Sequence, residues 1–308
     1  MPKIRYVDKR LSEDRLSVIE KANEIIEEYQ EQGFDLTLRQ LYYQFVARGL
    51  IPNKDTEYKK LGDVIADGRL AGLIDWEAIT DRTRNLRQNS HWKSPADIIS
   101  SAAESFAYDK WADQPYRIEC WIEKDALVGI LESACEPLDV PYFSCRGYTS
   151  ISEVWAAAMR LKKWKRKGQK TVILHLGDHD PSGIDMSRDI VDRLKIFGVN
   201  IVFNRLALNM DQVEQYDPPP NPAKVTDSRF KEYQALHGDE SWELDALDPP
   251  VLVALIEQNI IAYRNGARWD EAIDREIDAK AKLAKAAKNW EPISDTLDDY
   301  PDEEEDET

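Results

Sequence analysis

Apolar residues recur at helical spacing in the N-terminal part of the chain. Over residues 12–30 they stand three or four apart among charged residues, which predicts an amphipathic helix. A shorter helix is expected between Thr37, a good N-cap, and Gly49, a typical C-terminal stop. A third is expected over residues 55–70, and the mixed run GLIDWEAITDRTR after it predicts a small hairpin. Three helices and a hairpin are the order of a winged helix-turn-helix, so residues 1–88 are assigned to a DNA-binding domain of that kind.

The pattern changes after a connector over residues 89–113. Four short apolar runs, YRIECWI, VPYFSC, TVILHL and VNIVFNRLAL, are rich in β-branched and aromatic residues, which is typical of strands. Helical stretches separate these runs over residues 124–134, about 150–167 and 182–196. Strand alternating with helix predicts a parallel sheet covered on both faces. The fold class is therefore α/β, with a Rossmann-like domain over residues 114–206.

The remainder of the chain divides into two parts. Residues 207–292 form a helical C-terminal extension that contains the proline-rich loop DPPPNPAK. Residues 293–308 form an acidic tail, whose run DTLDDYPDEEEDET holds nine acidic residues and no basic one. We expect this tail to be disordered.

Charge and cysteine content limit which class of protein this can be. A net charge of −17 argues at first against a nucleic-acid partner, but basic residues gather at Arg82, Arg84 and Arg87 and in the run RLKKWKRKGQK over residues 160–170. DNA binding therefore stays open. Three cysteines without a C-x-x-C spacing indicate buried thiols in a reducing compartment. No apolar run approaches the ~20 residues of a membrane helix, and MPKIRYVDKR lacks the apolar region of a signal peptide. We expect a cytoplasmic protein without membrane contact.

Carboxylates stand where two of the predicted strands end. The first strand runs into Glu123 and Lys124, and the third runs into GDHDPSG, which holds Asp178 and Asp180. Functional groups gather at the carboxyl ends of strands in open parallel sheets, and residues two apart point to the same side. Three converging carboxylates are oxygen ligands suited to Mg²⁺, and such an ion indicates a phosphodiester substrate.

A D-x-D pair alone is weak evidence in a chain with 58 acidic residues, so the interpretation depends on the acid that ends another strand of the same sheet. His175 and His179 flank this region. Because His179 alternates with the aspartates, we expect it to point away from the metal and to serve packing or hydrogen bonding. No Walker P-loop and no G-x-G-x-x-G after a strand occur, so ATP binding by this chain is not expected.

Two adjacent tyrosines in LTLRQLYYQFVARGL fall on different sides of the second helix. At about 100° per residue, Tyr42 lies on the apolar arc and is expected in the core. Tyr43 lies off that arc, on the same side as Arg39 one turn earlier. An outward phenol can attack a phosphodiester while the guanidinium binds the phosphate. Without further evidence such a pair is usually only a surface contact.

Together these motifs resemble the family of the topoisomerase VI A subunit and its meiotic double-strand-break relatives. In that family a winged-helix domain carries the nucleophilic tyrosine in a T-x-R-x-x-[YF]-Y pattern, matched here by Thr37, Arg39, Tyr42 and Tyr43. A Toprim domain follows, with a V-E-K-D-A type motif matched by IEKDA and with D-x-D-P-x-G matched by GDHDPSG. The turn CRGYTS looks like the family's G-x-G-Y-P turn. The order of motifs agrees over roughly residues 10–205.

The resemblance implies a role for each matched residue. Tyr43 and Arg39 would be catalytic, and Glu123, Asp178 and Asp180 would hold Mg²⁺. The phosphate backbone would be contacted by a set of basic residues, namely Lys59, Lys60, Arg82, Arg84, Lys124 and Arg146.

The resemblance also implies partners. The active protein would be a homodimer on double-stranded DNA, nucleoid-associated, in which the tyrosine of one subunit works against the metal site of the other. Each tyrosine would form a 5′-phosphotyrosyl bond, so that the pair makes a double-strand break. The expected activity is that of a type IIB topoisomerase A subunit whose ATP site, if any, lies on a separate B-type ATPase subunit.

Some features depart from the family pattern. Gln40 replaces the acid often found after the arginine, Thr149 stands in place of proline and Cys145 in place of glycine. The chain is most similar to compact A-subunit-like proteins of mobile elements. Two alternatives stay open: a hydrolytic Toprim nuclease in which Tyr43 only positions DNA, and a non-catalytic winged-helix DNA-binding protein. Glu243 and Asp245 fall outside the matched motifs, and we expect a structural or dimer role for them.

Overall fold

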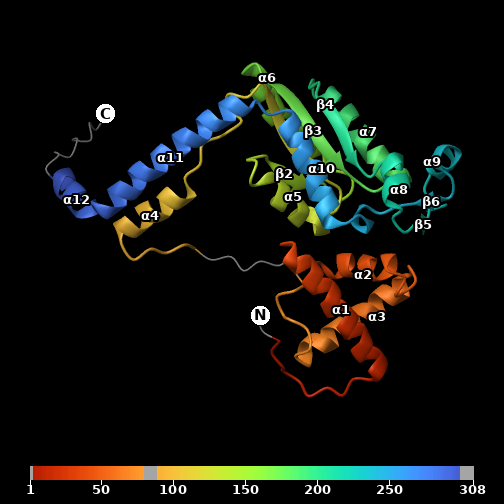
Figure 1. The fold of residues 1–308 in the computed structure, drawn as a ribbon. Coiled ribbons are helices and arrows are strands. Elements are labelled where there is room, and N and C mark those ends of the chain that lie inside the picture. Colours follow the sequence, from red (N-terminus) through yellow and green to blue (C-terminus); the bar gives the residue numbers. More distant parts are fainter. Residues whose placement is uncertain (1–2, 80–88, 299–308) are drawn as a thin grey trace. The chain divides into compact units, whose positions relative to one another are not determined.

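The computed structural model describes residues 3–79 and 89–298, and the chain divides into two compact units (Figure 1). The first unit comprises Met1–Asn85 with Tyr116–Tyr263, and the second comprises Leu86–Pro115 with Arg264–Thr308. The stretch expected to be a connector is therefore half of a unit of its own, completed by the C-terminal helices. The expected C-terminal extension is correspondingly split between the two units.

Three helices open the first unit, where the apolar spacing predicts them. They are α1 (Glu13–Glu31), α2 (Leu38–Ala47) and α3 (Asp55–Leu70). The start of α2 is fixed by a capping box: the Thr37 side chain accepts a hydrogen bond from the N–H of Gln40, and the Gln40 side chain accepts one from the N–H of Thr37 at 2.8 Å. This pairing gives Gln40, the residue that departs from the family pattern, a local structural role.

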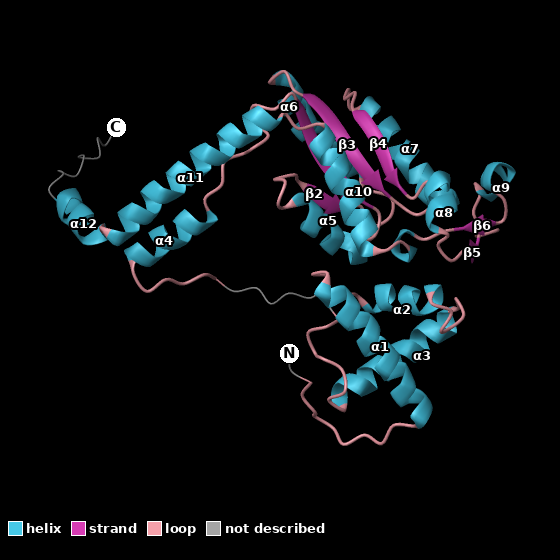
Figure 2. Ribbon diagram, in the orientation of Figure 1, coloured by secondary structure: helices cyan, strands magenta, loops and turns pink. Residues whose placement is uncertain are grey.

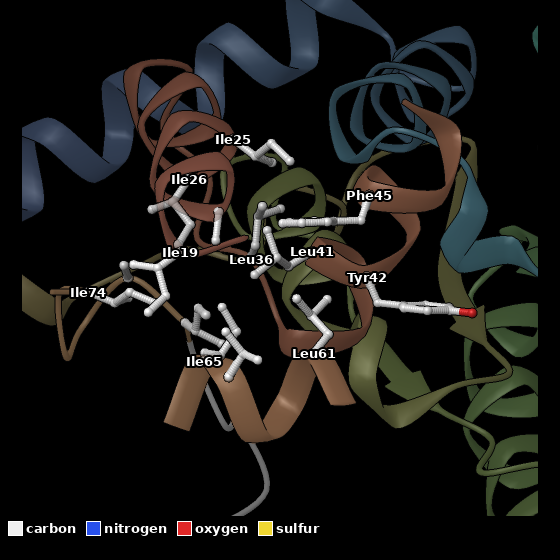
Figure 3. Packing of buried hydrophobic residues seen from close by; sticks show 14 of the residues in the cluster. Ile19, Ile25, Ile26, Leu36, Leu41, Tyr42, Phe45, Leu61, Ile65 and Ile74 are labelled. Atoms are coloured by element: carbon white, nitrogen blue, oxygen red, sulfur yellow. The ribbon is translucent and has the colours of Figure 1, made fainter. Parts of the chain in front are cut away.

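The helices share one apolar core. Figure 3 shows the side chains of Ile19, Leu41 and Ile65 pointing into the space between the three helices, and all are at least 96% buried. Tyr42 lies at the edge of this core with its ring buried, as its helical phase predicts. Its hydroxyl donates to Asn53 Oδ1 at 3.0 Å, which satisfies its polar end.

The hairpin expected after α3 is not seen in the half that the structure describes. Residues 72–79 form turns and bends, with a single parallel bridge between Leu36 and Ile79. The other half of the expected hairpin, residues 80–84, lies outside the described residues.

A four-stranded parallel sheet forms the centre of the first unit, in the order β2-β1-β3-β4. Its strands are β1 (Tyr116–Ile122), β2 (Tyr142–Ser144), β3 (Lys170–Leu176) and β4 (Val202–Ala207). All four coincide with the four apolar runs, and every pairing is parallel. The α/β class predicted from the sequence is confirmed.

Helices cover both faces of the sheet, which is why its strands are continuous apolar runs (Figure 2). On one face, Trp121 and Ile173 pack with α6 and α7; on the other, Cys120 meets Cys135 of α5, and α5 packs against α10. The bounds are α5 (Val128–Cys135), α6 (Ile151–Arg166), α7 (Pro181–Ile196) and α10 (Pro249–Ala262). The three cysteines are free and buried, as predicted.

Short elements complete the first unit between β4 and α10. They are α8 (Met210–Tyr216), β5 (Asn221–Pro222), α9 (Phe230–His237), β6 (Glu240–Ser241) and the 3₁₀ turn η2 (Leu244–Ala246), with a similar turn η1 (Asp125–Leu127) before α5. The strands β5 and β6 pair with each other in antiparallel fashion. This pairing brings the segment after β6 back toward the sheet.

The second unit is helical. It contains α4 (Pro95–Ser105), α11 (Gly266–Lys288) and α12 (Trp290–Asp298). Trp111 and Trp269 meet edge to face with ring centroids 5.9 Å apart, and Lys110 pairs with Glu276 at 2.8 Å. Because α12 reaches residue 298, the first residues of the expected disordered tail are helical; residues 299–308 lie outside the described residues.

Within the described parts of the chain, no helix has both the length and the apolarity needed to cross a bilayer.

The tryptophan pair predicts that the second unit can be destabilised alone. Replacing Trp269, which is 5% exposed, by alanine should cost about 3–5 kcal/mol of unfolding free energy in that unit. Hydrogen exchange should then show lost protection in α4 and α11 with protection of β1 and β3 retained. Trp155→Ala, at a site 53% exposed, is the matched control and should change neither. Equal loss of protection in the sheet would contradict this division.

Candidate functional site

A hollow of about 480 Å³ lies at the carboxyl edge of the sheet. Glu123 follows β1 directly, and Asp178 and Asp180 follow β3, so the strand ends bring these three carboxylates to one place. The complete lining is Arg39, Glu123, Lys124, Asp125, Ala126, Arg146, Gly147, Asp178, Asp180, Ser182, Lys224, Glu243 and Asp245. The arginine of the N-terminal motif therefore shares a cavity with the carboxylates of the two later motifs.

Glu123 and Asp178 are crowded together. Glu123 Oε2 accepts a hydrogen bond from the backbone N–H of Asp178 at 2.9 Å. Asp178 Oδ1 accepts from the N–H of Leu244 at 2.8 Å, and its Oδ2 lies 3.0 Å from Lys124 Nζ. Burial raises the pKa of Asp178 to about 7 and also raises the pKa of Glu123, with each nearby carboxylate adding to the effect. The hollow thus holds more negative charge than its protein partners neutralise.

Asp180 has a second task, because it caps α7. Its Oδ1 accepts from the N–H of Gly183 at 2.6 Å and from the Ser182 hydroxyl at 3.0 Å. Gly183 is needed for close packing rather than for an unusual backbone angle, since a Cβ there would lie 2.3 Å from the carbonyl oxygen of Asp178. The D-x-D-P-x-G spacing therefore holds the loop and the helix start in one tight turn.

Arg205 is a positioning residue that the sequence did not identify. Residues 177–180, which follow β3 and contain Asp178 and Asp180, are called the acidic loop. Arg205 extends from β4 to this loop, where its Nη2 donates to the carbonyl oxygens of Gly177 at 3.0 Å and Asp178 at 2.6 Å. Its Nη1 donates to the carbonyl oxygen of Gly183 at 3.0 Å and to the Ser187 hydroxyl at 2.6 Å. The one available signal was that Arg205 is the single charged residue in the strand-like run VNIVFNRLAL.

Glu243 and Asp245 join the hollow because their segment pairs with the acidic loop. The backbone of Trp242 exchanges two hydrogen bonds with that of His179, at 2.8 and 3.0 Å, and this bridge carries Glu243 to the edge of the sheet. A structural or dimer role was expected for the acids at 243 and 245. They also line the hollow, and only their spacing of two along the chain hinted at it.

Five charged residues form a network that we call the ionic cluster: Arg39, Lys124, Asp178, Glu243 and Asp245. Lys124 Nζ lies 2.9 Å from Glu243 and also pairs with Asp245 and Asp178. Arg39 Nε lies 2.7 Å from Asp245, and its Nη2 pairs with Glu243. Although burial opposes its charged form, Lys124 and Arg39 hold the pKa of Glu243 down at about 2. Arg39, expected to be catalytic, and Lys124, expected to contact DNA, are thus both paired with acids of the same chain.

Helical phase predicts that Tyr43 points outward, and this prediction is wrong: the residue is only 3% exposed. Its relation to Arg39 is as expected, with the guanidinium carbon 5.7 Å from the ring centroid. The off-arc side of α2 is covered by η2 and by Asn221, a hydrogen-bonding partner of the phenol. Burial, followed by the charges of Glu243 and Asp245, raises the pKa of Tyr43. In this state the phenol neither lines the hollow nor tends to ionise.

Of the other residues expected to contact DNA, the structure describes Lys59, Lys60 and Arg146, and all three are exposed. Lys59 and Lys60 are exposed on α3 and do not line the hollow. Arg146 lines it, with a side chain 75% exposed and a left-handed backbone (φ 53°). Arg82 and Arg84 lie outside the described residues.

The histidines serve packing and hydrogen bonding. His179 Nδ1 lies 2.9 Å from the Tyr233 hydroxyl, which confirms the role predicted for it, and His175 Nδ1 lies 3.0 Å from the Ser187 hydroxyl. Burial lowers the pKa of His175 to about 3 and that of His179 to about 4, so both rings are neutral.

The carboxylates suit a hard divalent cation in their chemistry. Across residues 3–79 and 89–298, no three His, Cys, Asp or Glu side chains are gathered as a ready-made ligand set. The hydrogen bonds seen in this part of the chain use Glu123 Oε2 and Asp180 Oδ1, which leaves Glu123 Oε1 and Asp180 Oδ2 for a cation. Burial is the main cause of the raised pKa of Asp178, and the neighbouring carboxylates of Glu123 and Asp245 raise it further.

No protein-family model matches the chain, and no curated protein sequence matches it.

The ionic cluster makes a prediction about Tyr43. Glu243→Gln removes a negative charge that raises the pKa of the phenol, so the pKa of Tyr43 should fall. NMR titration of the chain labelled with ¹³C at tyrosine Cζ would measure this, with Tyr43→Phe assigning the signal. Glu240→Gln, at the exposed first residue of β6, is the matched control and should leave the titration unchanged. An unshifted midpoint in Glu243→Gln would show that Glu243 does not act on the phenol.

Proposed function

We propose that this chain is a DNA-cleaving transesterase related to the topoisomerase VI A subunit. On this proposal, the N-terminal helices correspond to a winged-helix domain and the α/β domain to a Toprim domain. One observation supports it above the others: Arg39, from the tyrosine motif, lines the same hollow as Glu123, Asp178 and Asp180. A phosphate placed there would meet a guanidinium on one side and a group of carboxylates suited to Mg²⁺ on the other.

The residues would share the reaction as follows. Arg39 and Arg146 would bind the phosphate oxygens, while Glu123, Asp178 and Asp180 would hold Mg²⁺. When bound, the ion supplies charge stabilisation for the phosphate and for the departing 3′ oxygen. The Tyr43 oxygen forms a bond to phosphorus as the bond from phosphorus to the 3′ oxygen breaks. The phenolic proton leaves to a base, the 3′ oxygen gains a proton, and the 5′ phosphate stays on the tyrosine.

The described conformation is a closed state on this proposal. Tyr43 is buried and Arg39 is paired with Glu243 and Asp245, so α2 must separate from η2 before the phenol can reach DNA. DNA phosphates would compete with those two acids for Arg39. Separation would also let α2 approach the carboxylates of a second subunit, as a homodimer with shared sites requires. A separate ATPase subunit would be one means to drive the separation.

Burial of Tyr43 also supports a second candidate, a hydrolytic nuclease. A phenol that is 3% exposed and has a raised pKa is a poor nucleophile as it stands. In this alternative the same carboxylates and Mg²⁺ activate water, and Tyr43 only supports the Arg39 side chain through its ring.

Paired tyrosine variants separate the two candidates. After incubation with double-stranded DNA and Mg²⁺, SDS should trap wild-type protein on 5′ ends, and Tyr43→Phe should reduce the trapped fraction at least about 100-fold. Tyr42→Phe is the matched control: it removes the bond to Asn53 but should retain adducts. Glu123→Gln and chelation of Mg²⁺ should abolish cleavage under either candidate.

The outcomes discriminate clearly. Cleavage by Tyr43→Phe without adducts supports hydrolysis. Adducts that survive in Tyr43→Phe and vanish in Tyr42→Phe would assign the nucleophile to Tyr42. DNA binding without cleavage in the wild type, with thermal unfolding unchanged among the variants, would leave only the binding-protein alternative.

A further inference from the structure

A dense group of cations lies at the amino edge of the sheet, away from the hollow. The run from residue 160 to residue 170 contains seven basic residues and no acid. We define the basic patch as the exposed or half-exposed members of this run without an ion pair in the described structure, namely Lys162, Lys163, Lys165, Arg166, Lys167 and Lys170. The seventh, Arg160, pairs with Glu119 at 3.1 Å.

The topology separates this patch from the hollow. In a parallel sheet the covering helices run opposite to the strands, so the last turn of α6 and the first residue of β3, Lys170, share the amino edge (Figure 2). Glu123 and Asp178 follow the other ends of β1 and β3. The length of a seven-residue strand places the two edges about 20 Å apart.

Ordinary helix stabilisation does not account for the patch. Cations in a last turn favour the helix C-terminus, and Lys163, Lys165 and Arg166 serve this purpose in α6. The patch continues beyond the helix end through Lys167 to Lys170. In a chain of net charge −17, six neighbouring cations that form no ion pair with any described residue create a local field of opposite sign.

Trp164, which lies within the patch, limits the kind of polyanion that fits. Its ring is covered by Arg117, with the guanidinium carbon 4.0 Å from the centroid, and by Lys163 and Lys167 at 5.7 and 4.9 Å. Surfaces that bind single-stranded nucleic acids provide free aromatic rings on which unpaired bases stack. The ring of Trp164 is already covered by cations and does not offer such a platform. At about 100° per residue the α6 cations spread around the helix end, so they form a broad surface for a phosphate backbone.

We propose that the basic patch binds the sugar-phosphate backbone of double-stranded DNA, as a second DNA contact separate from the hollow. Binding there depends on charge and not on base sequence. The proposal needs DNA as a partner of the chain, but it does not need the cleavage chemistry.

The test measures binding of the full chain to a labelled 20-base-pair duplex by fluorescence anisotropy, in EDTA and at several salt concentrations. The patch variant is Lys163→Ala, Lys165→Ala, Arg166→Ala and Lys167→Ala combined. We expect affinity to fall at least about tenfold at 0.1 M salt, and the slope of log affinity against log salt to lose about one unit per phosphate contact removed. Alanine is a good helix former and the replaced residues are exposed, so folding should be retained.

Two controls keep the result specific. Lys280→Ala, Lys282→Ala, Lys285→Ala and Lys288→Ala combined remove the same charge from α11 and should change affinity much less. Lys163→Arg, Lys165→Arg, Arg166→Lys and Lys167→Arg combined keep the charge and should bind as the wild type does.

Each outcome decides the proposal. Wild-type affinity and slope in the patch variant, or equal loss in the α11 control, would overturn it. Loss confined to single-stranded DNA or RNA would also overturn it and assign the patch to that ligand. Failure of cleavage with patch-dependent duplex binding intact would count against the proposed transesterase alone.

Discussion

The pairing of Arg39 and Lys124 with Asp178, Glu243 and Asp245 is the interaction on which the architecture of the site depends. One of these residues lies in α2, one follows β1, one follows β3, and two lie at η2. Their attraction therefore joins four parts of the chain that are far apart in sequence. Asp245 has a side chain only 1% exposed, and a buried carboxylate needs a cation beside it. Removal of one partner from a buried ion pair typically costs about 3–5 kcal/mol.

The contact between the N-terminal helices and the sheet edge is largely polar elsewhere too. Tyr29 and Gln44 both donate to Asp248 Oδ1, at 2.7 and 2.8 Å, and Asn53 donates to Asn221 at 2.6 Å. Polar contacts of this kind can be exchanged for water or for DNA phosphates at small net cost, whereas an apolar core cannot. Polar bonds that can be replaced thus contribute to holding the N-terminal helices at this edge, and the proposed delivery of a buried tyrosine to DNA would require such bonds.

Much of this arrangement was predictable because it follows from local rules. The central strands β1 and β3 are largely buried apolar runs, and Thr37 with Gln40 marks the start of α2 through a capping box. The burial of Tyr43 was not predictable, since helical phase describes the core of the three helices and not the cover supplied by η2. Glu243 reaches the hollow through the bridge between Trp242 and His179, and the partner of the expected connector is α11, more than 150 residues later. Contacts of such sequence separation leave no local pattern.

On the proposed function, Tyr43 would form a covalent bond with DNA despite its burial in the closed state. Mass spectrometry of protein trapped on DNA with SDS, after digestion by nuclease and trypsin, tests this directly. Cleavage after Arg39 and Arg48 releases residues 40–48, QLYYQFVAR, which contain both tyrosines. We predict a nucleotide linked through its 5′ phosphate, with fragment ions that place it on Tyr43. A modified Tyr42, or cut DNA with this peptide unmodified, would contradict the account.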